Sequence, residues 1–397
     1  MSQRTISRQA GLVFFLTISL SPWVKAQDAG VSYRIHHQYV GTRPLGMGDA
    51  FVAVANDYNA LLYNPAGLAR REDGEMNLLI DVGISKSLPD LTKEISEAQD
   101  TQGSESDKQQ AMFDLLQKQY GKTIGLRLTP FSGFLVRPNW GIAVIPADVT
   151  LEGSIHQGVG PSLNTTVYAD TTVALGYGDD YKGFSNGRLS WGVTGKFINR
   201  GYFSKSINFI ELASDSKLIQ ESDMREGFGV DADLGLLYTP NLPDAGFLSL
   251  LRLTRPSFGL VVRNVAETKF TTSSKLLNKE KTEPPEKLHR VVDVGTRWEY
   301  PSMWLFGGRG VMDFRDLMHP SISLRKSLHL GLEFDWTVAS WWKGSYRVGL
   351  NQGYLTAGIS ALLGVFNLDA VTYGEDVGTY STPAENRMYA IRMNINW

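Results

Sequence analysis

From about Gly74 onward, apolar and polar residues alternate along segments of ten to fourteen residues, and this alternation limits the fold more than any other feature. A period of two places successive side chains on opposite faces of a strand. One segment puts Leu163, Val167 and Val173 on one face and Asp170 on the other. Strands of soluble proteins average five or six residues, whereas a tilted strand that crosses a bilayer needs about ten. The sequence therefore predicts long strands with one apolar and one polar face.

About fourteen such strands are expected, near residues 74–86, 122–137, 139–152, 163–178, 187–203, 226–240, 255–268, 288–300, 304–313, 326–339, 344–351, 354–363, 365–375 and 386–397. The long polar connections 87–121, 204–225 and 269–287 follow the first, fifth and seventh strands, so all three lie at one side of an antiparallel sheet. The connection 241–254 breaks this parity, and its Phe247, Leu248, Leu250 and Leu251 are expected to lie flat on a membrane surface. The predicted fold class is all-β membrane, an antiparallel transmembrane β-barrel of about fourteen strands with a short, partly helical N-terminal plug.

The first residues have the pattern of an export signal. Arg4 and Arg8 precede a short apolar run at 11–20, and Ala26 ends a stretch that a signal peptidase would read. Residues 1–26 are therefore assigned to a signal peptide, 27–73 to an N-terminal hatch and 74–397 to the barrel. No later run approaches the roughly 18 apolar residues of a membrane-spanning helix. The expected location is an outer membrane of the Gram-negative type, after cleavage near Ala26.

Composition excludes several classes of function. A formal net charge of −2 with scattered Lys and Arg does not suit binding of nucleic acid. The absence of cysteine removes disulfides and thiolate chemistry. No His-Glu-x-x-His motif occurs, and the pairing of His329 with Glu333 lacks an activated nucleophile. We expect no catalytic residue, no metal site and no cofactor.

The last strand carries a candidate assembly signal. Its outward residues alternate with polar ones and end on an aromatic residue, a form that resembles the signal read by the outer-membrane barrel assembly machinery. An ordinary edge strand is the alternative. The candidate signal residues are Tyr389, Ile391, Met393, Ile395 and Trp397.

Residues 27–73 do not alternate, and a short helix from about Asp49 to Ala55 is expected, followed by a turn at Asn64 and Pro65. The stretch 43–68 reads R-x-x-G-M-G-x-A-F-x-A-x-A-x-D followed by N-P-A-G-L. This pattern resembles the N-terminal hatch of the FadL/TodX-type outer-membrane long-chain fatty-acid transporter family and its relatives. The residues that carry the resemblance are Arg43, Gly46, Gly48, Asp49, Asp57, Asn64, Pro65 and Ala66.

The resemblance implies a fourteen-stranded barrel whose N-terminal segment plugs the lumen. It also implies passage of small hydrophobic molecules and contact with membrane lipids. The external loops that bind ligand in the family have no motif that aligns here. Some relatives serve in secretion or assembly instead.

Charged residues of both signs occupy the polar faces of neighbouring strands. They either form a polar pathway or fill the lumen with cross-strand ion pairs that hold the hatch, and we favour the second interpretation because a plugged barrel leaves little open water. The candidate lumen-lining residues are Asp170, Arg188, Lys196, Asp231, Asp233, Asp293, Arg297, Glu333, Asp335 and Arg392.

The first long connection is expected to contain a helix. A capping box at 106–109 opens it, and Met112, Leu115, Leu116 and Tyr120 form one stripe. That stripe would either line a hydrophobic access groove or pack down over the barrel mouth.

Two classes of function follow. The first is transport or binding of small hydrophobic molecules or lipids. The second is a structural, lipid-binding barrel that self-assembles, for example as a homo-oligomer, or partners other envelope proteins. A general diffusion porin is a third class, which the expected plug disfavours.

Overall fold

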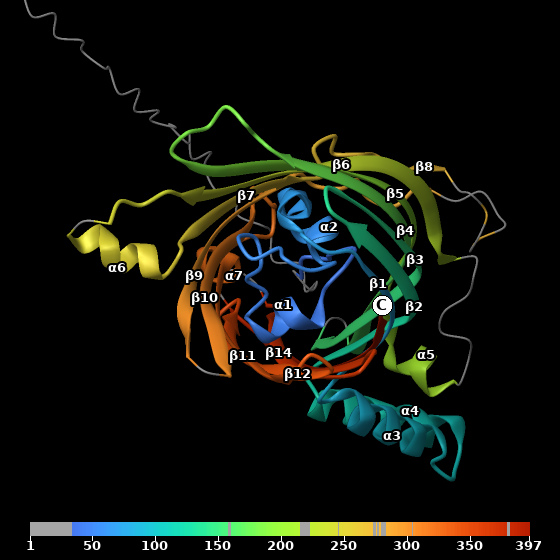
Figure 1. Ribbon diagram of the computed structural model, residues 1–397. Coiled ribbons are helices and arrows are strands. Elements are labelled where there is room, and N and C mark those ends of the chain that lie inside the picture. The colour runs from blue at the N-terminus through green and yellow to red at the C-terminus, as the bar shows by residue number, and fades with distance from the viewer. Residues whose placement is uncertain are drawn as a thin grey trace, which may run out of the picture.

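The computed structural model describes residues 34–397 except 158–159, 215–222, 245, 273–274, 276–277, 279–282, 304 and 379–381. The expected signal peptide lies outside these residues. Within these residues, fifteen strands pair in one antiparallel sheet, and β1 pairs with both β2 and β15, so the sheet closes on itself (Figure 1). The two-residue strand β8 (Thr271–Thr272) pairs only with β6, and the other fourteen strands form the wall. The prediction of a closed fourteen-stranded antiparallel barrel is confirmed.

The wall strands are β1 (Glu75–Ser85), β2 (Thr123–Arg137), β3 (Trp140–Gln157), β4 (Pro161–Asp180), β5 (Gly187–Asn208), β6 (Arg225–Pro240), β7 (Ser257–Arg263), β9 (Val291–Met303), β10 (Phe306–Leu317), β11 (Leu328–Ala339), β12 (Trp342–Asn351), β13 (Tyr354–Leu363), β14 (Phe366–Asp376) and β15 (Glu385–Asn396). The helices are α1 (Thr42–Gly46), α2 (Ala60–Tyr63), the 3-10 helix η1 (Pro65–Arg70), α3 (Leu88–Gln99), α4 (Glu105–Lys118), α5 (Phe209–Ala213), α6 (Phe247–Leu253) and α7 (Leu324–Ser327).

Alternation along each strand separates an apolar outer face from a polar inner face. On β6, Leu234 is 47% exposed whereas the adjacent Asp233 is buried, and on β11 Phe334 is exposed whereas Glu333 is buried. In a closed barrel every strand finds backbone partners on both sides, so an apolar outer face can contact lipid without unsatisfied backbone groups. The outer face is therefore the membrane-facing surface.

No helix in the described part of the chain is long and apolar enough to cross a membrane.

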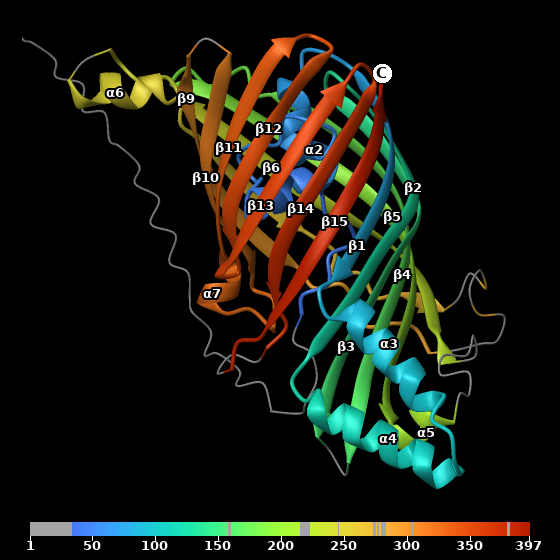
Figure 2. The ribbon, with the colours of Figure 1, turned by 90° about the horizontal axis from the view of Figure 1, so that it is seen from below.

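The two ends of the barrel differ in their connections. The end that holds the C-terminus, here called the terminal rim, has short turns such as the one between β2 and β3, and α6 is the only helix in its described connections (Figure 2). The opposite end, the loop rim, carries α3, α4, α5 and α7. The expected parity of the long connections is confirmed. In membrane barrels of this kind, short turns lie on the periplasmic side and long loops outside.

The strands β3, β4 and β5 contain 18, 20 and 22 residues, longer than expected, and they extend past the loop rim (Figure 2). Met112 and Leu116 of α4 pack with Leu163 of β4, which lies on the same strand face as the outward Val173. The α4 stripe therefore covers the outer face of these extended strands. Neither expectation for this helix, an access groove or a cover over the barrel mouth, matches this position.

The capping box of α4 also differs from its expected position. It starts at Ser104, two residues before Ser106, and Ser104 pairs with the side chain and backbone of Asp107. The helix starts earlier because the carboxylate of Asp107 can accept a hydrogen bond from the backbone amide of Ser104.

Candidate functional site: hatch, strap and lumenal cavity

Residues 41–74, here called the hatch, fill the lumen (Figure 1) and lie toward the terminal rim (Figure 2). The predicted helix from Asp49 to Ala55 is wrong, because this stretch forms irregular turns between α1 and α2. Asp49 and Ala55 have positive φ values of 62° and 32°, which a helix cannot contain. The carboxylate of Asp313 accepts hydrogen bonds from the amides of Phe51 and Val52 at 2.6 and 2.8 Å. Wall side chains thus replace the hydrogen bonds that a helix would have supplied.

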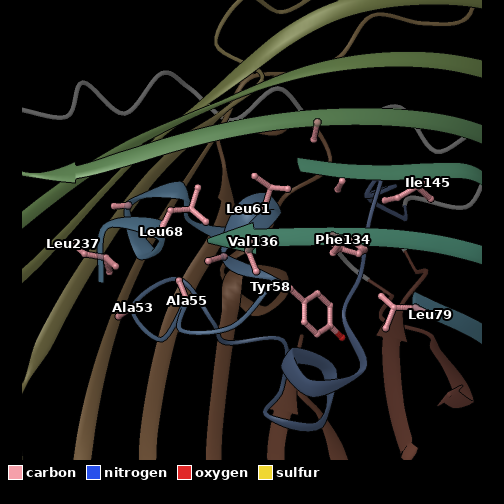
Figure 3. Packing of buried hydrophobic residues seen from close by; sticks show 14 residues of the cluster. Ala53, Ala55, Tyr58, Leu61, Leu68, Leu79, Phe134, Val136, Ile145 and Leu237 are labelled. Carbon is pink, nitrogen blue, oxygen red and sulfur yellow. The ribbon is translucent and has the colours of Figure 1, made fainter. Parts of the chain in front are cut away.

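The hatch packs its apolar side chains against inward residues of the wall. Tyr58, Leu61 and Leu68 join Phe134 and Val136 of β2 in one buried cluster (Figure 3). Fully burying a side chain of this size stabilises by roughly 1.5–3 kcal/mol. The hatch and wall therefore share one core and fold as one unit.

The backbone of the hatch comes closest to the wall at positions where the contacting residue is glycine. A β-carbon on Gly192 would overlap the backbone of Pro65 and Ala66. Gly48 itself has a φ of 66°, and a β-carbon there would overlap the carbonyl oxygens of Leu330 and Leu350. We call the wall glycines that face the hatch in this way the glycine belt, and its members are Gly178, Gly192, Gly235, Gly259, Gly295, Gly331, Gly349 and Gly358.

Ion pairs hold the hatch at defined points. The buried carboxylate of Glu333 accepts two hydrogen bonds from Arg43 at 2.8 and 2.7 Å, and it also pairs with Arg347 and Arg309. Arg43 continues to Asp57 at 2.7 Å. Since Glu333 is fully buried, removing any partner would leave charge in a low-dielectric site.

A second charged contact lies deeper in the lumen. Asp49 pairs with Arg315 of β10 and accepts a hydrogen bond from Tyr63 at 2.7 Å. The guanidinium of Arg315 also lies 5.0 Å from the ring centre of Tyr63. These contacts connect the turn after α1, the helix α2 and the wall.

The remaining expected hatch residues make backbone contacts. Thr356 of β13 donates to the carbonyl of Gly46 and accepts from the amide of Gly48, each at 3.1 Å. Asn64 donates to the carbonyls of Val52 and Leu236 at 2.8 and 3.1 Å. Its side chain also accepts the amide of Ala66, which fixes the start of η1.

The expected lumen-lining residues divide into two groups. Asp170, Lys196, Asp231, Asp233, Asp293, Glu333 and Arg392 are buried. Arg188, Arg297 and Asp335 lie near the terminal rim and are more exposed, with Arg188 pairing to Asp180 at 2.9 Å.

Nearly all members of the buried group contact a charged partner. Lys196 pairs with Asp233 at 2.8 Å, and Asp293 pairs with Arg263 at 2.6 Å. Arg392 pairs with Asp81 and donates to the carbonyl of Val40 at 3.0 Å.

Asp231 differs from this group because its carboxylate accepts backbone amides. The donors are Ala266 and Thr268, at 3.0 and 2.9 Å. These residues follow the end of β7, which has only seven residues, so a side chain satisfies amides that a longer strand would have paired with β6.

Residues 34–40, here called the strap, precede the hatch and run through the lumen near the loop rim. Arg34 pairs with Glu152 and Glu375 at 2.5 and 2.8 Å, so it links β3 to β14 across the lumen. His37 contacts Asp316 at 3.0 Å. The first part of the strap is thus held by the ends of side chains, whereas Tyr39 and Val40 pack with the hatch and the wall.

His36 is the most enclosed histidine of the strap. Its ring stacks on Tyr168 at 3.8 Å, and Nε2 lies 3.0 Å from Asp170, which also binds Arg200. Burial lowers the pKa of His36 to about 3, while the hydrogen bond to Asp170 acts in the opposite direction. His36 is therefore neutral when the strap is docked at neutral pH.

A cavity of about 390 Å³ lies between the strap, the inner wall and the residues that lead into β9. Ile35, Tyr168, Tyr202, Leu288 and Val291 contribute apolar surface. Polar and charged side chains, among them Lys196, Arg200 and His289, contribute the rest. A cavity of this size falls within the range of sites that hold small molecules.

Several residues that build this site carry no signal in the sequence pattern. Arg34, His36 and His37 precede the recognisable hatch motif, and the carboxylate of Asp313 resembles any inward acid of a strand. The glycine belt does have a signal, namely glycines on the inward positions of strands.

Within the described residues, no group of three or more His, Cys, Asp or Glu side chains could hold a metal ion.

Fold and site together define a transmembrane β-barrel whose lumen is closed by an N-terminal hatch. Similar solved structures include the toluene transporter TbuX of Ralstonia pickettii, with 10% identity, 90% of this chain and 98% of that chain covered, and a TM-score of 0.49. The toluene transporter TodX of Pseudomonas putida has 10% identity, 91% and 98% coverage and a TM-score of 0.44. A FadL homologue of Pseudomonas aeruginosa has 10% identity, 92% and 98% coverage and a TM-score of 0.40.

These likenesses concern the fold alone. No protein-family model and no curated protein sequence matches the chain.

Proposed function

We propose that this protein is an outer-membrane barrel that binds small, largely hydrophobic molecules in the lumenal cavity and passes them toward the membrane or the periplasm. The cavity of about 390 Å³ beside the strap carries the proposal. It lies toward the loop rim, where long external loops are expected, and the hatch closes the lumen beyond it. A ligand would therefore come from outside and meet the strap before the hatch.

The two sides of the cavity differ in a way that supports transport and not only closure of the lumen. One side is the fixed wall, whereas the other is the strap, which is held by the ends of Arg34, His36 and His37. A segment held by side chains can change position without unfolding the sheet beneath it. The protein would then act as a binding and gating barrel with no catalytic chemistry.

A matched pair of substitutions on β9 tests the cavity. Val291 is buried and lines it, whereas Val294 on the same strand is 42% exposed and faces the membrane. Val291→Trp should fill the cavity and weaken binding of toluene or decanoate at least tenfold, whereas Val294→Trp should bind like the parent protein. Calorimetry in detergent measures the affinity, and heat-dependent gel mobility verifies that both variants form barrels. Equal binding by both variants would exclude the cavity as the ligand site.

The alternative is a structural barrel that embeds in lipid and assembles with copies of itself or other envelope proteins. The glycine belt and the ion pairs of Glu333 favour it, since both oppose opening of the hatch. Native mass spectrometry of the detergent-extracted protein separates the two. A monomer with one small hydrophobic molecule supports transport, whereas a ring of subunits that retains many phospholipids supports the structural role.

We also propose that β15 is read by the barrel assembly machinery after export and cleavage near Ala26. Tyr389, Ile391, Met393 and Trp397 lie on the outer face and are about half exposed. Deletion of Trp397 should slow assembly and leave export unchanged. An unchanged yield of heat-modifiable barrel in outer-membrane fractions would contradict this.

A further inference from the structure

One helix projects away from the barrel. α6 (Phe247–Leu253), in the connection between β6 and β7, points sideways from the terminal rim in both views (Figures 1 and 2). Its sequence, FLSLLRL, has five apolar residues among seven. Leu248 is 40% exposed and Leu253 is 61% exposed. In water, such an arrangement would leave apolar surface uncovered.

The connection attaches α6 to the rim at a defined place. The amide of Glu299 on β9 donates to the carbonyl of Thr254, immediately after the helix, at 2.7 Å. Arg252 pairs with Asp244 at 3.0 Å, and both side chains are more than half exposed. The helix thus presents apolar residues together with charges that remain in contact with water.

The same rim carries an aromatic girdle on the outer face of the barrel. Exposed aromatic side chains stand at the strand ends and turns of this rim, and they include Trp140, Tyr300, Phe306, Trp341, Trp342 and Trp397. Such residues mark the level at which hydrocarbon meets headgroups. α6 extends outward from this level.

We propose that α6 is an interfacial anchor that lies in the headgroup–hydrocarbon boundary of the leaflet at the terminal rim. Helices that combine apolar residues with charges in contact with water bind at this depth. The apolar surface of α6 continues the membrane-facing band of the barrel, so lipid is already the neighbour of the strands at its base. The anchor sets the depth of the barrel beside the short strand β7.

A protein partner fits this helix less well. Seven residues of helix extend only about 10 Å. A stable protein–protein interface needs about 800 Å² on each partner, with an apolar centre surrounded by polar groups. Lipid is the one occupant whose chemistry and extent match.

The sequence contains no cysteine, so a single introduced cysteine is the only residue that a thiol-reactive spin label modifies. Leu248→Cys and Leu253→Cys are spin-labelled in the full mature protein and reconstituted in phosphatidylethanolamine–phosphatidylglycerol vesicles. Accessibility to oxygen, which concentrates in lipid, is compared with accessibility to a water-soluble nickel chelate. Val230→Cys on the outer face of β6 serves as the lipid control, and Lys93→Cys on α3, 78% exposed at its side chain, serves as the water control.

We expect the oxygen-to-nickel ratio at 248 and 253 to lie near that of position 230 and at least fivefold above that of position 93. A ratio equal to that of position 93 would overturn the proposal, since the helix would then lie in water. Low accessibility to both reagents would also overturn it and indicate protein contact. If that protection were lost on dilution of the protein in the vesicles, the contact would be with a second copy. Each result is independent of ligand binding in the lumen.

Discussion

The hatch and the strap occupy the same lumen and contact the same wall, yet different chemistry holds them. The hatch places its backbone against the glycine belt and buries Tyr58, Leu61 and Leu68 in a shared core. The strap joins the hatch core through Tyr39, but its first residues reach the wall through the side chains of Arg34 and His36, with a cavity beside them.

This difference identifies which part can move. Backbone packed on glycine has one position, because a small shift produces overlap of main-chain atoms. Side-chain ion pairs can exchange partners or take up water. We therefore expect the strap to respond to ligand while the hatch keeps the lumen closed. The following substitutions test this comparison, starting with the largest expected effect.

Placing a side chain at one glycine of the belt should lower the free energy of unfolding more than any other change considered. Gly192 and Gly195 lie on β5, but only Gly192 contacts the hatch, whereas the nearest atom to a β-carbon at Gly195 is 4.0 Å away. Gly192→Val should lower the free energy of unfolding by more than about 4 kcal/mol or leave the hatch undocked. Gly195→Val should change it by less than about 1 kcal/mol. Heat-dependent gel mobility and protease resistance of the hatch measure both, and equal stability of the two variants would refute tight docking.

The next largest effect is expected at the ion pairs between Glu333 and its arginine partners, which include Arg43 of the hatch. Glu333→Gln removes the charge that three arginines share, so buried guanidinium groups lose their counter-ion, and we expect a loss of about 3 kcal/mol. The matched change is Asp335→Asn on the same strand, where the side chain is 34% exposed and pairs with Arg309 alone. Its loss should stay below about 1 kcal/mol. Thermal unfolding in detergent measures both losses. Equal melting temperatures of the two variants would contradict the expectation that Glu333 contributes more than Asp335.

The sequence predicted the wall better than the site. Strand number, face assignment and the side of each long loop follow from a period of two and from parity, which are local properties. The exposed Leu234 beside the buried Asp233 shows the face assignment directly. The irregular course of residues 49–55 could not be predicted, because Asp313 supplies its hydrogen bonds from more than 250 positions away. The position of the strap could not be predicted either, because its partners Glu152 and Glu375 come from strands that are distant in the sequence.

A smaller and more local effect is expected at Arg34. Arg34→Met leaves Glu152 and Glu375 near each other without their cation, which should release the strap at a cost of about 2 kcal/mol in docking. A spin label at Gln38→Cys should become mobile, while the thermal stability of the barrel changes by less than about 1 kcal/mol. A drop in barrel stability as large as that of Glu333→Gln would show that strap and hatch are one unit.

Mild acid, between about pH 7 and pH 5.5, should weaken docking of the strap by the smallest amount, about 1 kcal/mol. The pKa of docked His36 is lowered to about 3 by burial, whereas a released imidazole has its ordinary value near 6.5. The released strap therefore binds a proton that the docked strap does not, so docking is strongest above about pH 6.5 and weakens as pH falls from there toward 3. The slope reaches at most about 1.4 kcal/mol per pH unit.

The label at position 38 should accordingly become mobile on acidification, and His36→Phe, which can keep the stack on Tyr168 without titrating, should suppress this change. His37, Asp316 and Asp170 face the same region and remain in both proteins, so the difference between the two pH profiles belongs to His36. Identical profiles would show that acid acts elsewhere in the lumen. A shared loss of barrel stability would show that the strap does not move independently of the hatch.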